Sequence, residues 1–268
     1  MIQLGLDFTQ RWRHRRHRFR PAGELIQPRE YDVAPIADDA TARGFVVTHH
    51  YAASYPAARA RYGLYRHGAL VGVAVFSHPV NDHTLTSVFP GDARESVELG
   101  RFVLLDSVPG NGETWFLARA FAQLRRDGYR GVVSFSDPVA RTVADGRVVF
   151  PGHVGVIYQA SNGCFLGRGT ARTLRLLPDA TVFSDRAVQK LRKGERGWRY
   201  AAALLERHGA ETAPEDTTAR RAWLATWLPR VTRPLRHPGN FKYAWAFARS
   251  DARTLPASAP YPRLQVAA

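Results

Sequence analysis

The chain has 268 residues, of which 45% are apolar and 23% are charged, so most of it is expected to fold around a core. The length suits one large domain, or one domain with sizeable additions. No apolar run approaches the roughly 18 residues of a membrane span, and no apolar signal-peptide core follows the basic N-terminal stretch. The single cysteine, Cys164, excludes a disulfide framework and a cysteine-rich zinc site.

Basic residues outnumber acidic residues by 38 to 23, which gives a formal net charge of +15. Lys190, Lys193 and Lys242 are the only lysines, which leaves 35 arginines. The planar guanidinium matches phosphate oxygens, so this balance predicts a polyanionic partner, foremost nucleic acid. A GC-rich genome is the alternative explanation for arginine in place of lysine, but it does not explain the surplus of positive charge.

Much of this charge falls close to the N-terminus. Residues 11–20 read RWRHRRHRFR, in which Trp12 and Phe19 are interleaved with basic side chains. Like charges at this density repel, so we expect a flexible arm over residues 1–24 that contacts DNA phosphates. A solvated tail without a ligand is the alternative. The candidate DNA-binding residues here are Arg11, Arg13, Arg15, Arg16, Arg18 and Arg20.

The hydrophobic pattern then predicts an α+β fold with a local βαβ crossover. Within the expected strand at 97–106, alternation places Leu99 and Arg101 on one face and Phe102 and Leu104 on the other. An arginine among apolar strand residues is costly unless it faces a pocket or a partner, and we expect a pocket. The predicted elements are strand 29–36, a helix that follows Asp38 and Asp39 and runs through Ala42 to His49, strands 60–66 and 70–78, strand 97–106, helix 115–124 and strand 131–136.

The C-terminal part is expected to extend the same domain, which would span residues 25–250. Its basic stretch, 184–236, contains two short helical patterns around Gly194 and Gly197, loosely like a helix-turn-helix. A solvated basic face would look the same. Residues 241–247 predict a last strand, and residues 251–268 a loose tail. The candidate DNA-binding residues in this part are Lys190, Arg192, Lys193 and Arg196.

The segment Ser107–Gly112, with sequence SVPGNG, joins a predicted strand to a predicted helix. Two closely spaced glycines before a helix N-terminus suit a pyrophosphate, although a tight turn has the same composition. This arrangement resembles the GNAT acyltransferase fold, which implies a mixed central sheet flanked by helices. In that fold, a loop between the fourth strand and the third helix binds the pyrophosphate of acyl-coenzyme A. Ser107 stands where that family has Gln or Arg. The candidate cofactor residues are Ser107, Gly110, Asn111, Gly112 and Thr114.

Further motifs resemble the Mom family of phage DNA-modification proteins, over about residues 45–177 with a weaker likeness to about 247. They are His49-His50-Tyr51, Glu98-Leu99-Gly100-Arg101-Phe102, Asn111 with Thr114-Trp115-Phe116-Leu117, Ser134-Phe135-Ser136-Asp137, Gly152-His153-Val154-Gly155 and Ile157-Tyr158-Gln159-Ala160-Ser161-Asn162.

This resemblance implies a GNAT-like fold and a transferase that converts adenine in DNA to N6-carbamoylmethyladenine, which shields the DNA from restriction. It also implies a phage- or prophage-encoded protein that works in the cytoplasm of a bacterial host. The residues that match the family's functional positions are His50, Tyr51, Arg101, Asp137 and Tyr158, with Thr114 where serine is usual. Asn111, Ser136 and His153 are further candidates.

The resemblance also suggests roles. Asp137 would take a proton from the adenine amine, and Tyr51 or Tyr158 would stack on the displaced base. Arg101 would hold a carboxylate or phosphate, and His50 would act as a base or a metal ligand. The family pattern is interrupted between Asp137 and Gly152 by VARTVADGRVVF, for which we expect a hairpin beside the site.

The implied product raises a question about the group donor. A thioester such as acetyl-coenzyme A forms an amide on nitrogen, whereas a carbamoylmethyl group is attached through a methylene carbon. The donor is therefore expected to be acyl-coenzyme A or a related molecule combined with a further step, for which iron is one candidate. Two other functions stay open, namely a GNAT acyltransferase acting on tRNA, protein or a small amine, and a non-catalytic DNA-binding protein.

Overall fold

The computed structural model describes residues 8–263, and the chain divides into two compact units. The sheet unit comprises Met1–Pro138, Gly152–Gly169 and Asn240–Ala268, and the helical unit comprises Val139–Pro151 and Thr170–Gly239. The single domain over residues 25–250 stays a prediction, and the helices of the C-terminal part bury their apolar faces in a core of their own. Within residues 8–263, no helix has the length and apolar character that a membrane crossing requires.

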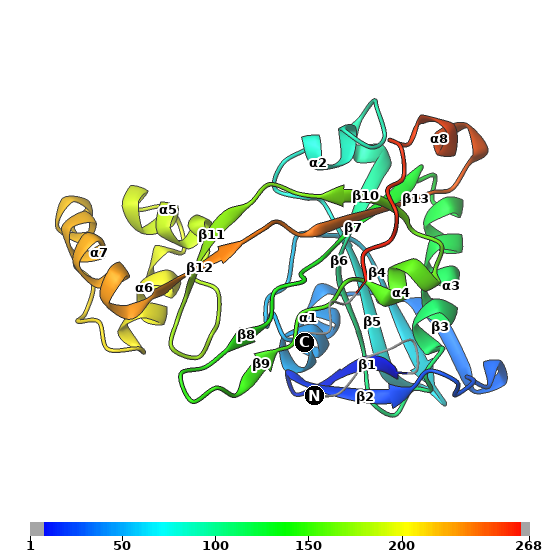
Figure 1. Cartoon of the computed structure of the whole chain (residues 1–268), viewed down its shortest axis with the longest axis horizontal. Helices are drawn as coiled ribbons and strands as arrows, with labels where there is room; N and C mark the ends of the chain where they lie inside the picture. The colour runs from blue at the N-terminus through cyan, green and yellow to red at the C-terminus, as the bar shows by residue number, and fades with distance from the viewer. Residues whose placement is uncertain (1–7, 264–268) are drawn as a thin grey trace. The chain divides into compact units, whose positions relative to one another are not determined.

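The elements of the sheet unit follow the predicted order, with additions at both ends (Figure 1). They are β1 (Phe8–Arg13), β2 (Arg16–Pro21), the 3-10 helix η1 (Pro28–Glu30), β3 (Tyr31–Pro35), α1 (Asp39–His49), β4 (Ala58–Arg66), β5 (Ala69–Ser77), α2 (His83–Thr86), the 3-10 helix η2 (Ala93–Glu95), β6 (Ser96–Leu104), α3 (Gly112–Arg126), β7 (Gly131–Ser136), α4 (Val156–Ala160), β10 (Cys164–Arg168), β13 (Phe241–Ala246) and α8 (Arg249–Thr254).

Seven of the described strands form one mixed sheet in the order β10-β13-β7-β6-β5-β4-β3. All neighbouring pairs are antiparallel except β6 and β7, which run parallel because α3 carries the chain from one to the other. Counted along the described chain, β6 is the fourth strand of this sheet and α3 is the third α-helix. The glycine loop therefore lies where the GNAT resemblance places it.

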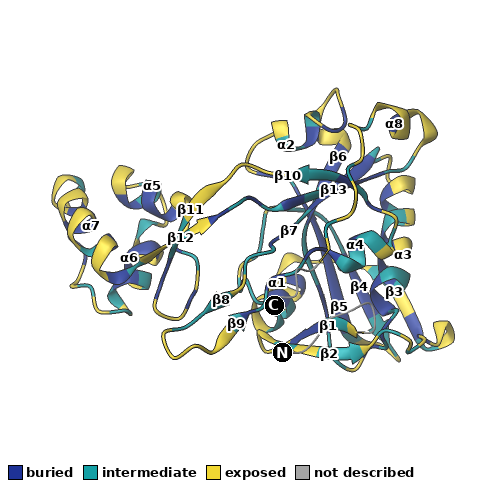
Figure 2. Ribbon diagram, in the orientation of Figure 1, coloured by how far each residue is buried: buried dark blue, intermediate teal, exposed yellow. Residues whose placement is uncertain are grey.

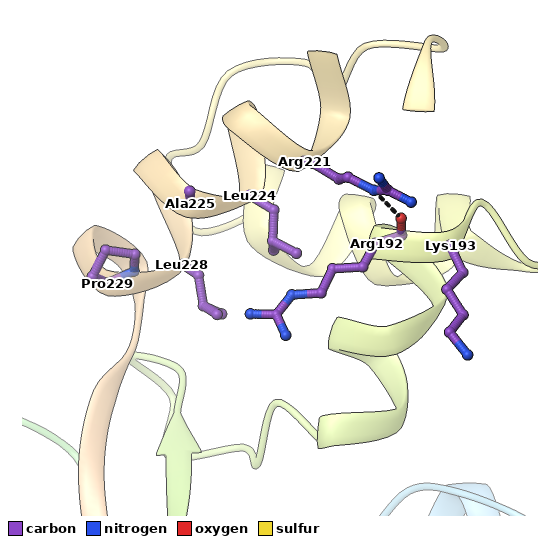
Figure 3. A pocket seen from close by; sticks show the side chains of 7 residues that line it. All are labelled: Arg192, Lys193, Arg221, Leu224, Ala225, Leu228 and Pro229. Carbon is purple, nitrogen blue, oxygen red and sulfur yellow. Dashed lines mark hydrogen bonds between the residues drawn. The ribbon is translucent and has the colours of Figure 1, made fainter. Parts of the chain in front are cut away.

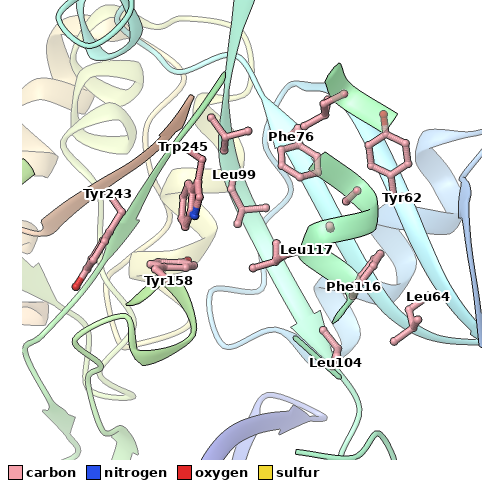
Figure 4. Close-up of a cluster of buried hydrophobic side chains, with 14 of the residues drawn as sticks. Tyr62, Leu64, Phe76, Leu99, Leu104, Phe116, Leu117, Tyr158, Tyr243 and Trp245 are labelled. Carbon is pink, nitrogen blue, oxygen red and sulfur yellow. The ribbon is translucent and has the colours of Figure 1, made fainter. Parts of the chain in front are cut away.

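The main core lies between the sheet and α3 (Figure 4). Phe116 and Leu117 of α3 are fully buried there against Leu99 and Leu104 of β6. On the other face, α1 contacts β4, β5 and β6. The strands are consequently buried on both faces, whereas the outer surfaces of the helices are exposed (Figure 2). This two-sided cover explains why β5 reads as an almost continuous apolar run.

A β-bulge in β6 changes which residues share a face. Leu99 pairs with Phe76 of β5, but Arg101 pairs with Val75, so Gly100 is an extra residue in the strand. Leu99 therefore packs in the same core as Phe102 and Leu104, and Arg101 turns to the opposite face. The expectation that Leu99 and Arg101 share a face was wrong, because simple alternation does not survive a bulge.

The N-terminal basic segment is folded. Residues 8–21 form an antiparallel hairpin, β1–β2, whose turn has left-handed backbone at His14 and Arg15 (φ 47° and 61°). Arg11 and Trp12 are buried, and the amide of Arg15 donates to the carbonyl of His49 at the end of α1 (3.0 Å). The expected flexible arm is therefore a β-hairpin packed on the sheet unit.

The helical unit contains a small antiparallel sheet, a separate hairpin and three helices. Its elements are β8 (Arg141–Thr142), β9 (Val148–Phe150), β11 (Arg172–Leu176), α5 (Asp185–Lys193), α6 (Trp198–Glu206), α7 (Thr217–Val231) and β12 (Arg233–His237). β8 and β9 pair as a hairpin, which confirms the hairpin expected for the insertion. α5 and α6 are separated by Gly194 and Gly197, both in left-handed conformation, as the sequence pattern predicts.

A buried arginine holds the three helices together. Arg220 of α7 is 1% exposed, and its guanidinium lies over the ring of Trp198 in α6, 3.9 Å from the centroid. It donates to the carbonyl oxygen of Leu191 at 3.0 Å and to that of Glu215 at 2.8 Å. These bonds satisfy a charge that would otherwise be costly to bury.

The C-terminal part differs from the expected loose tail. Phe241–Ala246 is the predicted last strand, and it lies inside the sheet between β7 and β10. Residues 249–254 then form α8, and Asp251 pairs with Arg130 at 2.7 Å. Residues 264–268 lie outside the described part of the chain.

We expect Gly131→Ala to lower the free energy of unfolding by about 1–3 kcal/mol, because overpacking a buried site costs this much. A Cβ at Gly131 would lie 2.4 Å from the backbone oxygen of Trp245, which cannot move without disturbing β13. Gly44→Ala, in an exposed position of α1 with nothing within 4 Å, should instead stabilise by up to about 1 kcal/mol. Urea denaturation measures both, and equal effects of the two substitutions would contradict this account.

Candidate active site

The parallel strands β6 and β7 separate after a short paired stretch. Their register runs from Ser96 opposite Gly131 to Glu98 opposite Val133. Beyond it, the hydroxyl of Ser134 in β7 donates to the carbonyl of Leu99 at 3.2 Å, so a side chain spans the widening gap. A gap between strands leaves backbone groups unpaired, and polar side chains gather there to satisfy them.

Tyr158 of α4 enters this gap. Its ring packs edge-on against Tyr243 and Trp245 of β13, with centroids 5.4 and 5.5 Å away, and its hydroxyl shares a hydrogen bond with Ser134. Burial raises the pKa of Tyr158 above its ordinary value, so the phenol stays protonated. Tyr158 is 6% exposed and lies beside Tyr243 and Trp245 (Figure 4), so its ring is covered and a base does not reach it in this arrangement.

Arg101 of β6 is fixed by the loop after α1. Its Nε donates to the carbonyl of Ser54 at 2.8 Å, and a terminal nitrogen donates to the Ser54 hydroxyl at 2.7 Å. The other terminal nitrogen donates to the carbonyl of Gly100. One edge of the guanidinium is thus occupied by Ser54, while the two terminal nitrogens keep further N–H groups for a ligand.

A partly buried carboxylate, that of Glu98, accompanies Arg101. Glu98 lies before the bulge and Arg101 after it, and the extra residue at Gly100 brings both side chains to the same face. Burial raises the pKa of Glu98, and the nearby Arg101 opposes this shift. Burial of an arginine is much less costly beside a carboxylate, so Glu98 supports the position of Arg101.

His50 and Tyr51 follow α1 directly. His50 is buried, and its Nδ1 accepts a hydrogen bond from the amide of Ala52 at 3.1 Å, which leaves the proton of the neutral ring on Nε2. Burial lowers the pKa of His50, and Arg101 and His153 lower it further. Tyr51 is partly exposed, with its ring 4.2 Å from that of His50 and 4.9 Å from that of Trp12.

Asp137 and His153 meet at the end of β7. Asp137 is 9% exposed, and its carbonyl accepts a hydrogen bond from the amide of His153 at 2.8 Å. Burial lowers the pKa of His153 to about 4, although Asp137 favours its charged form. Beside them, the hydroxyl of Ser136 is buried and makes no hydrogen bond among the described residues. An unsatisfied buried hydroxyl is costly and suits a substrate contact.

The structure therefore brings together all five residues predicted as catalytic. The cluster of His50, Tyr51, Arg101, Asp137 and Tyr158 lies in the sheet unit, with His153 and Ser136 among them. Glu98 belongs to a motif that the sequence analysis singled out, but it was not among the candidate site residues. Ser54 was missed, because a serine in a polar loop gives no signal by itself.

The side chains of this cluster are not arranged as a metal site. Between residues 8 and 263, no group of three or more histidine, cysteine, aspartate or glutamate side chains is arranged to hold one. His50 also uses its Nδ1 for a backbone contact. The residues present thus do not fit the suggested iron.

The glycine loop is not an open cradle. The side-chain oxygen of Asn111 accepts a hydrogen bond from the backbone amide of Ile26 at 2.7 Å. The backbone amide of Asn111 donates to the carbonyl of Glu24 at 3.1 Å. Gly112 donates back to Pro109, and the Thr114 hydroxyl donates to the carbonyl of Asn111 at 3.0 Å. Ser107 is exposed. The residues proposed for a cofactor thus hold the loop and the preceding chain together, and they do not fit a pyrophosphate.

The arginines of the N-terminal hairpin differ in their surroundings. Arg11 is buried in an ion pair with Glu113, so it is a structural residue. Arg13 and Arg18 both pair with Asp106, at 3.4 and 3.2 Å, and Arg20 pairs with Glu24. Arg15 and Arg16 are exposed at the tip of the hairpin. The tip is therefore the part of this segment that is free to meet a polyanion.

The helical unit has a basic pocket of about 530 Å³ between α5 and α7 (Figure 3). Arg192, Lys193 and Arg221 line it, and Arg192 extends across it towards Leu228. Nε of Arg221 donates to the carbonyl of Arg192 at 2.8 Å, which joins the two helices. The other lining residues are Leu224, Ala225, Leu228 and Pro229. Of the remaining basic candidates, Arg196 is exposed and Lys190 lies over the ring of Tyr200.

We expect His153 to make stability depend on pH. In the unfolded chain a histidine takes up a proton near its ordinary pKa of 6.5, whereas folded His153 does so only near a pKa of about 4. The unfolded state therefore binds more protons in this window, and the free energy of unfolding falls as the pH drops through it. Urea denaturation across this range should show a smaller fall for His153→Gln than for wild type. The exposed His83→Gln is the control, and equal pH slopes in wild type and His153→Gln would refute the assignment.

Two solved structures are similar to parts of the chain. A crystal structure of an N-acetyltransferase from Staphylococcus aureus Mu50 has a TM-score of 0.27 and 17% identity, and the match covers 43% of this chain and 56% of that one. A tandem GNAT protein from the clavulanic acid biosynthesis pathway, solved without AcCoA, has a TM-score of 0.42 and 10% identity, with coverages of 81% and 98%. No curated protein matches this chain.

A protein-family model matches one continuous part of the sequence that makes up more than half of the chain. It describes the Mom protein family and spans residues 30–219, from β3 into α7. The match includes the motifs that contain His50, Arg101, Asp137 and Tyr158. The chain belongs to the Mom protein family.

Proposed function

We propose that this chain is a transferase that adds a carbamoylmethyl group to N6 of adenine in DNA and thereby protects the DNA from restriction. The observation that carries the proposal is the gathering of His50, Arg101, Asp137 and Tyr158 at the divergence of β6 and β7. Buried charged and polar groups are expensive for a fold, and they concentrate at sites of chemistry.

The target nitrogen needs help from the protein. The N6 amine is conjugated with the adenine ring and is stacked and paired in duplex DNA, so the base must leave the stack before it reacts. Tyr51, which is partly exposed and has its ring against those of His50 and Trp12, is the aromatic side chain that we assign to stacking on it. Tyr158 is then assigned a different role from the one first considered, as a protonated hydroxyl that is hydrogen-bonded to Ser134 and holds the gap between β6 and β7 in place.

The reacting carbon is the methylene of an acetamide that carries a leaving group. In the proposed step, N6 forms a bond to this carbon, the leaving group departs with the electron pair, and the N6 proton passes to Asp137. The remaining N–H groups of Arg101 bind the acetamide oxygen or the departing group. His50 and His153, neutral because of burial, add hydrogen bonds without adding charge.

Two basic surfaces are proposed to hold the DNA. One is the hairpin tip with Arg15 and Arg16, and the other is the pocket with Arg192 and Lys193. All four side chains are exposed. Contacts of this kind neutralise phosphates and position a duplex without reading its sequence.

We expect Asp137→Asn to reduce adenine modification by at least about 100-fold, because the side chain keeps its shape but no longer accepts a proton. The readout is mass spectrometry of nucleosides from plasmid DNA of cells that express each variant. The control is Asp145→Asn, which removes an exposed turn carboxylate of the β8–β9 hairpin. Full modification with Asp137→Asn would refute its role, and unaltered deoxyadenosine with wild type would refute the proposed function.

We expect loss of basic side chains to weaken DNA binding and to lower its salt dependence. Each phosphate contact that is removed should reduce the slope of log K against log salt by about 0.9. Arg15→Gln with Arg16→Gln, and Arg192→Gln with Lys193→Gln, should each show this effect in fluorescence anisotropy at several salt concentrations. Arg253→Gln, an exposed change on α8, is the control. A double variant with an unchanged slope would remove that surface from the proposal.

A further inference from the structure

The glycine loop already holds an anion, and the anion belongs to the protein. The carboxylate of Glu24 accepts a hydrogen bond from the amide of Gly110. Arg20 binds the same carboxylate through both of its oxygens, with Nε at 2.7 Å and a terminal nitrogen at 2.5 Å. These bonds keep the pKa of Glu24 below its ordinary value, first through Arg20, so the group is charged. The carboxylate of Glu24 thus accepts from the loop amide in the way that a bound phosphate would.

The other amides of the loop also have acceptors. Val108 donates to the carbonyl of Leu105 at 3.1 Å, and Gly112 donates to that of Pro109 at 3.0 Å. Asn111 donates to the carbonyl of Glu24, and proline has no N–H. Each amide from Val108 to Gly112 is thus bound within the chain, and a pyrophosphate would have to displace at least Glu24 to be held here.

The backbone before β3 also closes the space over the loop. A Cβ at Gly110 would lie 2.2 Å from the carbonyl oxygen of Pro21 and 3.0 Å from the backbone of Ala22. Arg11 adds a second attachment, since it donates to the carbonyls of Pro109 and Gly110 and pairs with Glu113 at the start of α3. Glycine is required at position 110 by this close approach of the chain itself.

We infer that residues 20–26 fill the anion position of the glycine loop, with Glu24 as its internal anion, and that the group donor reaches the site without a pyrophosphate held at this loop. This inference rests on the proposed function only in calling that molecule a donor. It assigns to Ser107–Gly112 the task of anchoring the N-terminal segment. The donor is then a small molecule recognised at the Arg101 cluster, in place of a coenzyme gripped by its pyrophosphate.

The first test uses the full chain with acetyl-coenzyme A and with inorganic pyrophosphate, without DNA. Calorimetric titration up to about 1 mM is expected to show no saturable binding of either probe to wild type. Hydrogen exchange of residues 107–114 is expected to stay unchanged by the probes. Binding of acetyl-coenzyme A with new protection of residues 107–114 would overturn the inference.

The second test removes the internal anion. Glu24→Ala should expose the Gly110 amide and raise the affinity for pyrophosphate at least about tenfold, which is about 1.4 kcal/mol. Glu30→Ala is the matched control, because Glu30 pairs with Arg66 in the same kind of ion pair but does not contact the loop. Equal affinities in Glu24→Ala and wild type would overturn the role of Glu24. Neither measurement depends on adenine modification, so the inference and the proposed function can fail separately.

Discussion

The separation of β6 from β7 is the constraint on which the site depends. Parallel strands pair only while their backbones stay close, and here the pairing extends from Ser96 to Glu98. Beyond it, Ser134 and Tyr158 supply hydrogen bonds in place of the lost ladder. The opening therefore exists at little cost, because polar side chains occupy it and the apolar core on the α3 side continues unbroken past it.

Charge inside this opening is balanced locally. Arg101 is partly buried, lies beside Glu98 and is held by Ser54, so its orientation is set before any ligand arrives. His50 and His153 are kept neutral by burial, which avoids further positive charge around the arginine. Groups fixed in advance in a site of low polarity interact strongly with charge that develops in a reaction. This physical arrangement suits transfer to a weakly nucleophilic amine.

Much of the fold could be predicted because it depends on local periodicity. The residue pattern located α1, α3 and β4 to β7, and the wide apolar stripe of α3 was sufficient to place it against a sheet. The family motifs named as candidates His50, Tyr51, Arg101, Asp137 and Tyr158, which the structure places near one another. The sheet face on which Glu98 and Arg101 lie was harder to predict, because a bulge inserts one residue into β6 and reverses the faces that simple alternation assigns. The helical unit was also hidden, since a separate core is a property of contacts and not of sequence order.

The sequence by itself determined the balance of charge, the helix and strand periods and the flexible geometry of the glycine loop, all of which are short-range properties of neighbouring residues. Only the tertiary structure decided what those features contact. A run of arginines reads as a repelling arm, yet long-range pairing with Glu113 and Asp106 folds it into a hairpin. A loop with free amides reads as a cradle, yet Glu24 occupies it. The reason is that a local pattern specifies which bonds a segment can form, whereas the partner is chosen by the packing of chain segments distant in sequence.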